Sequence, residues 1–155
     1  MPEKREKLVK RLVLEVFSHA TESEDRILEA IRRLLGSQVD EEHLSKQVLH
    51  GYHGNPVILL RYSSREGEAQ REASHILSSL DDFDAEELER SIGDRVAKGK
   101  LFLRLDKQDA YLGETRLSDQ DDVIKVVITF YPHIRGNEKI LWALRKLGLG
   151  HGETT

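Results

Sequence analysis

The stretch His50-Gly51-Tyr52-His53-Gly54-Asn55-Pro56 separates two strand-like runs, 44–50 and 56–62. Glycine and Asn-Pro set backbone geometry rather than fill a core, so the stretch predicts a shaped loop. The continuous apolar run 56–60 predicts a central strand that is buried on both faces. Because two strands joined by so short a connection should be antiparallel, the stretch predicts a hairpin.

Hydrophobic periodicity predicts further strands and helices on both sides of this hairpin. Strands are expected at 12–17, 101–106, 110–112 and 123–131, and helices at 22–36, 69–80, 85–97 and 137–148. Thr21 with Glu24 has the form of a capping box, and Asp84 and Asn137 are expected to cap two later helices. The order of elements predicts one α+β domain over 1–155, with a mainly antiparallel sheet and helices packed on one face. Its core would span about 8–131, followed by the helix at 137–148 and a tail at 149–155.

Alternation within two of these strands also predicts which side chains face the helices. The apolar residues on one side should be buried under the helices, namely Leu101, Leu103, Ile124, Val126 and Ile128. Arg104 and Lys125 should then face away. Phe17, Phe102 and Tyr131 are candidates for the same outer face, where aromatic rings beside cations can stack nucleic-acid bases. The other interpretation is that a helix or a second subunit covers this face.

Composition excludes several classes of protein and site. The 155-residue chain has no cysteine, which excludes disulfides, zinc-thiolate sites, iron-sulfur clusters and thiol catalysis. Neither a secretory signal nor a run of transmembrane length is found, so we expect a cytoplasmic protein. The net charge of −4 argues mildly against a generic polyanion binder.

The distribution of charge is more informative than its sum. Residues 44–65 contain no acid, while Lys46, Arg61 and Arg65 are basic and His50 and His53 can become so at mildly acid pH. We therefore include Lys46 and His50 among the candidate binding residues. Such a segment could give an acidic protein one cationic face.

Motifs for catalysis are missing from the sequence. It has no phosphate-binding glycine loop, no nucleophile elbow and no His-Glu-x-x-His helix. A metal site formed by His50 and His53 with Asp106 or Asp109 is one remaining alternative, although the spacing is not diagnostic. Arg104 to Gln108 could be a solvated turn at a strand end, or could place Lys107 on a phosphate and Gln108 on a base or sugar.

Four stretches in the same order carry a resemblance to a known family. They are Ser18-His19-Ala20-Thr21-Glu22-Ser23-Glu24-Asp25, then 51–56 (Gly-Tyr-His-Gly-Asn-Pro), then 103–108 (Leu-Arg-Leu-Asp-Lys-Gln), then 121–126 (Asp-Asp-Val-Ile-Lys-Val). Together they make residues 13–131 resemble a family of archaeal RNA-binding proteins described as predicted exosome subunits. The resemblance implies a small α+β domain, likened to the double-stranded-RNA-binding domain and to ribosomal protein L-five, without catalysis of its own. It also implies candidate RNA-binding residues, which are His19, Thr21, His53, Gly54, Asn55, Arg104, Lys107, Gln108 and Lys125.

The leading hypothesis is a non-catalytic RNA-binding protein that acts as an accessory factor in RNA processing or decay. Its partners would be RNA and exosome or other RNA-processing proteins, with no cofactor, no catalytic residue, no metal and no membrane. A structural subunit that mainly contacts protein is the second hypothesis, and a metal-dependent hydrolase is the third. The oligomeric state, the preferred RNA and the role of the last helix with Trp142 stay open.

Overall fold

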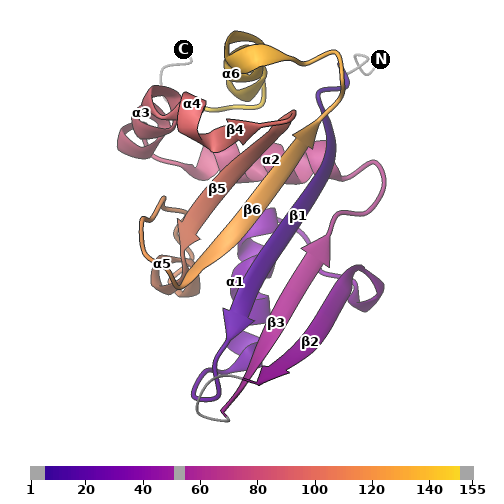
Figure 1. Ribbon diagram of the computed structural model, residues 1–155, viewed down its shortest axis with the longest axis vertical. Coiled ribbons are helices and arrows are strands. Elements are labelled where there is room, and N and C mark those ends of the chain that lie inside the picture. Colours follow the sequence, from indigo (N-terminus) through magenta and orange to yellow (C-terminus); the bar gives the residue numbers. More distant parts are fainter. Residues whose placement is uncertain (1–5, 51–54, 151–155) are drawn as a thin grey trace.

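A computed structural model of the chain describes residues 6–50 and 55–150 and confirms an α+β fold with one antiparallel sheet (Figure 1). The strands are β1 (Val9–Ser18), β2 (Leu44–His50), β3 (Pro56–Ser63), β4 (Val96–Ala97), β5 (Lys100–Asp106) and β6 (Val123–Phe130). The helices are α1 (Glu24–Leu35), the short 3₁₀ helix η1 (Glu41–His43), α2 (Ala69–Ser79), α3 (Asp82–Arg90), α4 (Ile92–Arg95), α5 (Lys107–Tyr111) and α6 (Gly136–Lys146). Across the sheet the strand order is β2-β3-β1-β6-β5-β4.

The predicted hairpin is present. β2 and β3 pair antiparallel from Leu44 opposite Tyr62 to His50 opposite Pro56, while loop residues 51–54 lie outside the described residues. β3 lies inside the sheet, between β2 and β1, but is not buried on both faces as expected. Leu60 and Tyr62 are buried whereas Arg61 is exposed, because helices cover only one side of the sheet.

The hydrophobic core lies between the sheet and the two helices α1 and α2. α1 and α2 lie behind the strands in Figure 1, and the other face of the sheet is turned toward the viewer. The predicted apolar core residues of β5 and β6 are all 0–1% exposed: Leu101, Leu103, Ile124, Val126 and Ile128. From the other side of the core, α1 contributes Ile27, Ile31 and Leu35. The predicted orientation of these strands is therefore confirmed.

The helix predicted at 85–97 is wrong in its second half. α3 ends at Arg90, α4 covers only four residues, and Val96–Ala97 form β4, which pairs with the start of β5. Lys98 and Gly99 have φ angles of 53° and 75°, so they form the tight turn of a β-hairpin rather than a helix end. Asp81 caps α3, while the expected cap Asp84 is buried and accepts a hydrogen bond from the backbone N–H of Leu117.

The strand predicted at 110–112 is also wrong, because the chain forms a short helix directly after β5. The carboxylate of Asp106 accepts a hydrogen bond from the Asp109 backbone N–H at 2.9 Å and so caps α5. The expected return strand is replaced by a single bridge between Leu105 and Leu117. As a consequence, Lys107 begins a helix instead of lying in an open turn.

The other two residues expected to cap helices, Thr21 and Asn137, are not at the N-cap positions either. Ser23, not Thr21, caps α1 by accepting a hydrogen bond from the Arg26 backbone N–H. α6 begins at Gly136 after Arg135, so Asn137 is already inside the helix. Both helices start within a residue or two of the predicted position, since the apolar spacing that defines them was correct.

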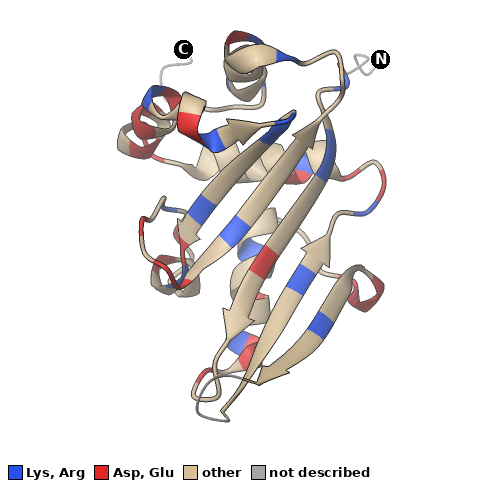
Figure 2. Ribbon diagram, in the orientation of Figure 1, with Lys and Arg blue, Asp and Glu red and all other residues tan. Residues whose placement is uncertain are grey.

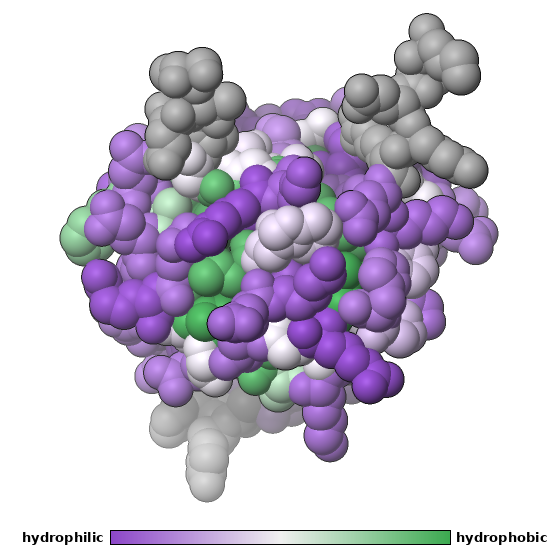
Figure 3. Space-filling model, turned by 90° about the horizontal axis from the view of Figure 1, so that it is seen from above, coloured by the Kyte–Doolittle hydropathy of each residue, from purple (hydrophilic) through white to green (hydrophobic). Residues whose placement is uncertain are grey.

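α6 completes the core rather than extending from it. Ile140, Ala143 and Leu144 are buried, and Leu149, which the sequence analysis assigned to the tail, is only 4% exposed. The surface at this end of the molecule mixes hydrophilic and apolar side chains (Figure 3). Among the described helices, none has the combination of length and apolarity needed to cross a lipid bilayer.

Candidate functional site

The sheet face opposite α1 and α2 carries an excess of basic side chains. Because strand residues alternate between faces, the register with buried neighbours assigns each side chain to one side. The outward charged residues on the strands are the basic Arg11, Arg61, Lys100, Arg104 and Lys125 and the acidic Glu15 and Asp106. Figure 2 shows basic residues distributed over the strands, whereas many acidic ones lie on α3 and in the loops. An acidic protein thus has one cationic face.

The centre of this open face is a cross-strand row of charged residues. Arg61, Glu15, Lys125 and Arg104 are consecutive partners on β3, β1, β6 and β5. Arg61 and Glu15 form an ion pair at 3.6 Å. Lys125 has no ion-pair partner among the residues that the structure describes, so its ammonium group remains available to a ligand.

Arg104 is held in place by the loop that precedes β6. Its guanidinium donates a hydrogen bond to the Gln120 carbonyl and lies 3.9 Å from the Asp121 carboxylate. Its Nε atom is buried without a hydrogen-bond partner among the described residues. The Arg104 side chain is therefore partly committed to the fold, while Lys125 beside it is exposed.

Lys107 is buried, which contradicts its expected position at an exposed strand tip. Its side chain is 1% exposed, and Nζ donates hydrogen bonds to the Phe17 carbonyl at 2.7 Å and to the Glu22 carboxylate at 3.0 Å. The Asp122 carboxylate lies 2.9 Å from the same nitrogen. The ammonium group contacts oxygen atoms of three residues, so Lys107 joins the end of β1, the turn before α1 and the loop before β6, and it is too deeply buried to reach a phosphate.

The partner carboxylate, Glu22, is adapted to this contact. Burial alone would raise the pKa of Glu22, but hydrogen bonds from the His19 backbone N–H, from Lys107 and from Tyr111 together lower it below its ordinary value. The Tyr111 hydroxyl donates to the other Glu22 oxygen at 2.9 Å. Glu22 is thus the centre of a hydrogen-bond network that connects three segments of the chain.

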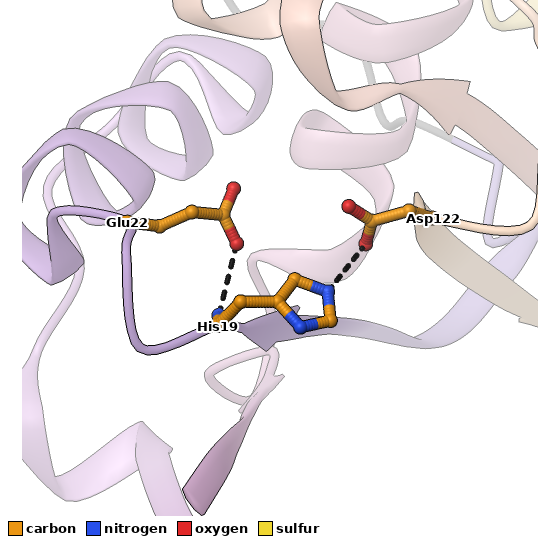
Figure 4. A group of neighbouring side chains, drawn as sticks. All are labelled: His19, Glu22 and Asp122. Carbon is orange, nitrogen blue, oxygen red and sulfur yellow. Dashed lines mark hydrogen bonds and ion pairs between the residues drawn. The ribbon is translucent and has the colours of Figure 1, made fainter. Parts of the chain in front are cut away.

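His19, Glu22 and Asp122 could supply three metal ligands, since their ligand atoms all lie within 4.8 Å of one another (Figure 4). His19 Nε2 lies 3.4 Å from Asp122 Oδ1. However, Lys107 Nζ already contacts both carboxylates of this group. Because this ammonium group already supplies a cation to both carboxylates, the cluster is a structural network of ion pairs rather than an open metal site.

The metal site considered from the sequence is not assembled. His50 is on β2 and Asp106 is on β5, four strands apart in the sheet order. At about 4.8 Å per strand, their backbones are separated by roughly 19 Å, too far for one ion. His53 lies outside the described residues, and the Asp106 carboxylate is used to cap α5.

The other described candidates from the sequence lie in three places. Lys46 is on the helix side of β2 and forms an ion pair with Glu24 of α1, whose hydrogen bond raises the pKa of the lysine. His50 and Asn55 are exposed at the two ends of the hairpin loop, and Gly54 is outside the described residues. His19, Thr21 and Gln108 are exposed near the end of β1 and on α5. The structure therefore does not join all of these residues into one surface.

Several residues of the open face were not among the sequence candidates. Arg61, Lys100 and Arg11 share the outward side with Lys125, as strand alternation could have indicated. Phe17 and Phe102 do lie on this face, as considered from the sequence, and are 37% and 44% exposed. Tyr131 follows β6 and stacks on His133 instead, with ring centroids 6.3 Å apart.

Comparison with known proteins gives a consistent family match. The sequence model of a family described as RNA binding matches residues 11–130, which include the sheet except the first two residues of β1 and exclude α6. The uncharacterized protein MJ0213 of Methanocaldococcus jannaschii is 37% identical over 127 residues, which cover 79% of this chain and 85% of that protein. The RNA-binding protein PAB1135 of Pyrococcus abyssi is 28% identical over 137 residues, covering 86% and 89% of the two chains.

Solved structures share the fold. The crystal structure of protein AF2318 from Archaeoglobus fulgidus, assigned to the family DUF54, superimposes with a TM-score of 0.74 at 27% identity. The match covers 90% of this chain and 99% of that one, so the whole α+β arrangement is shared.

Proposed function

This chain belongs to the protein family described as RNA binding, and from that premise we propose that it is a non-catalytic RNA-binding protein whose open sheet face contacts the RNA. The observation that carries the proposal is the cationic open face of a protein with a net charge of −4. Phosphates supply most of the electrostatic attraction in such complexes. Lys125 is the basic residue on this face that is best placed to contact them.

The proposed contacts retain part of the candidate set from the sequence. Arg104 and Lys125 act on the open face, and exposed residues near the end of β1, on α5 and beside the hairpin loop extend the contact: His19, Thr21, Gln108, His50 and Asn55. His53 and Gly54, which lie outside the described residues, stay in the proposed set on the strength of the sequence. Lys107 is withdrawn from this set because it is buried, and Lys46 because it pairs with Glu24 on the helix side. We assign both lysines to the stability of the fold.

A role as an accessory factor in cytoplasmic RNA processing or decay, in association with the exosome, is the finer part of the proposal. Its support is the resemblance carried by the motifs at 18–25, 51–56, 103–108 and 121–126. Co-purification of exosome subunits with the tagged protein, with and without ribonuclease treatment, tests the association. A partner that stays bound after ribonuclease treatment is held by protein contacts.

Salt-dependent RNA binding tests the main proposal. Fluorescence anisotropy with a labelled single-stranded RNA should show affinity that falls with salt, with a log-log slope of about −0.7 per phosphate contact. Lys125→Ala should weaken binding to many RNA sequences alike and flatten the slope by about one contact. The matched control is Lys146→Ala on α6, which removes the same charge away from the open face and should leave the slope unchanged.

Two results would contradict the proposal. If wild-type protein shows no salt-dependent RNA affinity, the structural-subunit hypothesis is favoured. If labelled RNA is shortened on incubation with Mg²⁺ or Zn²⁺, and chelation stops the cleavage, the non-catalytic assignment is wrong.

A further inference from the structure

Two phenylalanines on the open face suggest how RNA would be held there, an inference that rests on the proposed function. Of the large apolar side chains that the structure leaves exposed, Phe17 and Phe102 lie on the outward side of the sheet. Exposed aromatic rings on a cationic face are typical of surfaces that stack nucleic-acid bases. Phe83 is more exposed, at 69%, but lies on α3, away from the sheet.

The register of the sheet puts Lys125 midway between the two rings. Phe102 on β5 is opposite Val127 of β6, two residues from Lys125. Lys125 is opposite Glu15 of β1, two residues from Phe17. Each phenylalanine is thus one strand and two residues away from Lys125, which is about 8 Å between Cα atoms, and the Cα atoms of the two phenylalanines are roughly 17 Å apart. The three residues form a diagonal across β5, β6 and β1.

This spacing selects unpaired RNA. In a double helix the faces of the bases are covered by their neighbours, and A-form RNA presents phosphates, 2′-hydroxyls and base edges instead. Bases that remain stacked are only about 3.4 Å apart along a strand, so two rings separated by five times that distance cannot serve adjacent stacked bases. They fit bases that are splayed out from a single strand.

The charges along the diagonal favour a phosphate at its centre. Lys125 makes no ion pair with any residue that the structure describes, and the adjacent Glu15 is engaged by Arg61 at 3.6 Å. Arg104 lies directly beside Lys125 and adds a second positive charge. An RNA backbone that passes between the two rings therefore lies next to the positive charges of Lys125 and Arg104 rather than next to Glu15, the one carboxylate of the row.

We infer that this face takes a single-stranded RNA, with one unpaired base stacked on Phe102, a second on Phe17, and the backbone between them at Lys125. The ligand class is thereby narrowed from RNA in general to unpaired segments. Sequence preference would be weak, because every base offers a face for stacking.

Stacking can be separated from charge by substitutions at the rings. Wild type should bind a single-stranded 12-mer more tightly than the same strand annealed to its complement. Phe102→Leu and Phe17→Leu keep an apolar side chain and remove the ring, so each should weaken single-strand binding about fivefold or more while leaving the salt slope unchanged. Phe83→Leu is the matched control on α3 and should bind as wild type. Each variant must retain the wild-type melting temperature.

Crosslinking of the wild-type protein provides a measurement that needs no variant. RNA carrying 5-iodouridine should crosslink to Phe102 and Phe17 on irradiation, as identified by mass spectrometry of the peptides. Equal affinity for the duplex, or full affinity in both leucine variants with crosslinks elsewhere, would overturn the stacking inference while RNA binding itself stands. Absence of any RNA binding by wild type would instead overturn the proposed function and this inference together.

Discussion

The ammonium group of Lys107 lies 3.0 Å from the Glu22 carboxylate, although the two residues are 85 positions apart in the chain. The lysine side chain is almost completely buried, whereas Glu22 remains 17% exposed. A lysine in this position requires its partners, since an unpaired buried charge is strongly destabilising. The contact therefore makes Lys107 a structural residue, and its consequences can be measured.

Substitution of Lys107 should affect stability more than RNA binding. Lys107→Met leaves Glu22 and Asp122 without their shared cation and should lower the free energy of unfolding by about 2–3 kcal/mol, less than for a fully buried pair because both carboxylates are partly exposed. Urea denaturation measures the change. Addition of Glu22→Gln to Lys107→Met should recover part of the loss. A Lys107→Met protein of wild-type stability that has lost RNA affinity would show that the lysine reaches the ligand.

Glu22 should also contribute to the dependence of stability on pH. Its pKa in the folded protein is lowered from the ordinary value of 4.5, so its ionised form stabilises the fold above that pH. This contribution is lost as pH falls through the lowered pKa. Glu22→Gln should therefore be less stable than wild type at pH 7, and the difference should shrink below pH 4.5. A stability difference that is the same at pH 7 and pH 3 would contradict this role.

Glu72 should show the opposite dependence. Burial raises the pKa of Glu72, although the Tyr62 hydroxyl, which donates to it at 2.5 Å, acts in the other direction. A raised pKa favours the protonated form in the fold, so the fold is best stabilised below pH 4.5 and loses stability as pH rises through the raised value. Glu72→Gln should therefore melt at a higher temperature than wild type at pH 8, with a smaller gain at pH 4.

The exposed Glu86 of α3 supplies the control for this comparison. Glu86→Gln makes the same chemical change on the surface and should leave the melting temperature nearly unchanged at both pH values. If Glu72→Gln is the less stable protein at pH 8, the carboxylate is stabilising in its ionised form and the predicted sign is wrong.

Glu15 is the acidic member of the central row on the open face, so its removal should strengthen RNA binding. A single negative charge about 8 Å from a phosphate at Lys125 opposes binding by about 0.5 kcal/mol in water, which is roughly a twofold change in affinity. Glu15→Gln should show this gain at low salt and lose it at high salt, as measured by anisotropy. Glu86→Gln changes the net charge equally and should have a smaller effect. A weaker affinity in Glu15→Gln would place the RNA away from this row.

Local patterns in the sequence were sufficient for the longer helices α1, α2 and α6 and for the main strands. The alternation in 101–105 and 123–130 predicts buried leucines and isoleucines and outward Arg104 and Lys125, because side chains in a strand alternate strictly between two faces. The hairpin around 50–56 follows from the short loop between two strands. The errors at 85–97 and 110–112 arise where short elements depend on pairing with β5 or on a cap by Asp106, which hydrophobic periodicity does not contain.

The amino-acid sequence by itself thus determined the fold class, the side of the sheet on which the residues of β5 and β6 lie, and an unusual distribution of charge. Only the tertiary structure decided which residues meet. It placed Lys125 midway between Phe102 and Phe17 because β5, β6 and β1 are neighbours in the sheet, although they are far apart in the chain. It buried Lys107 because the turn before α1 brings Glu22 to the end of β5. Lysine at a strand end carries the same local signal whether it is exposed or buried, so its role depends on a distant carboxylate that no local pattern can reveal.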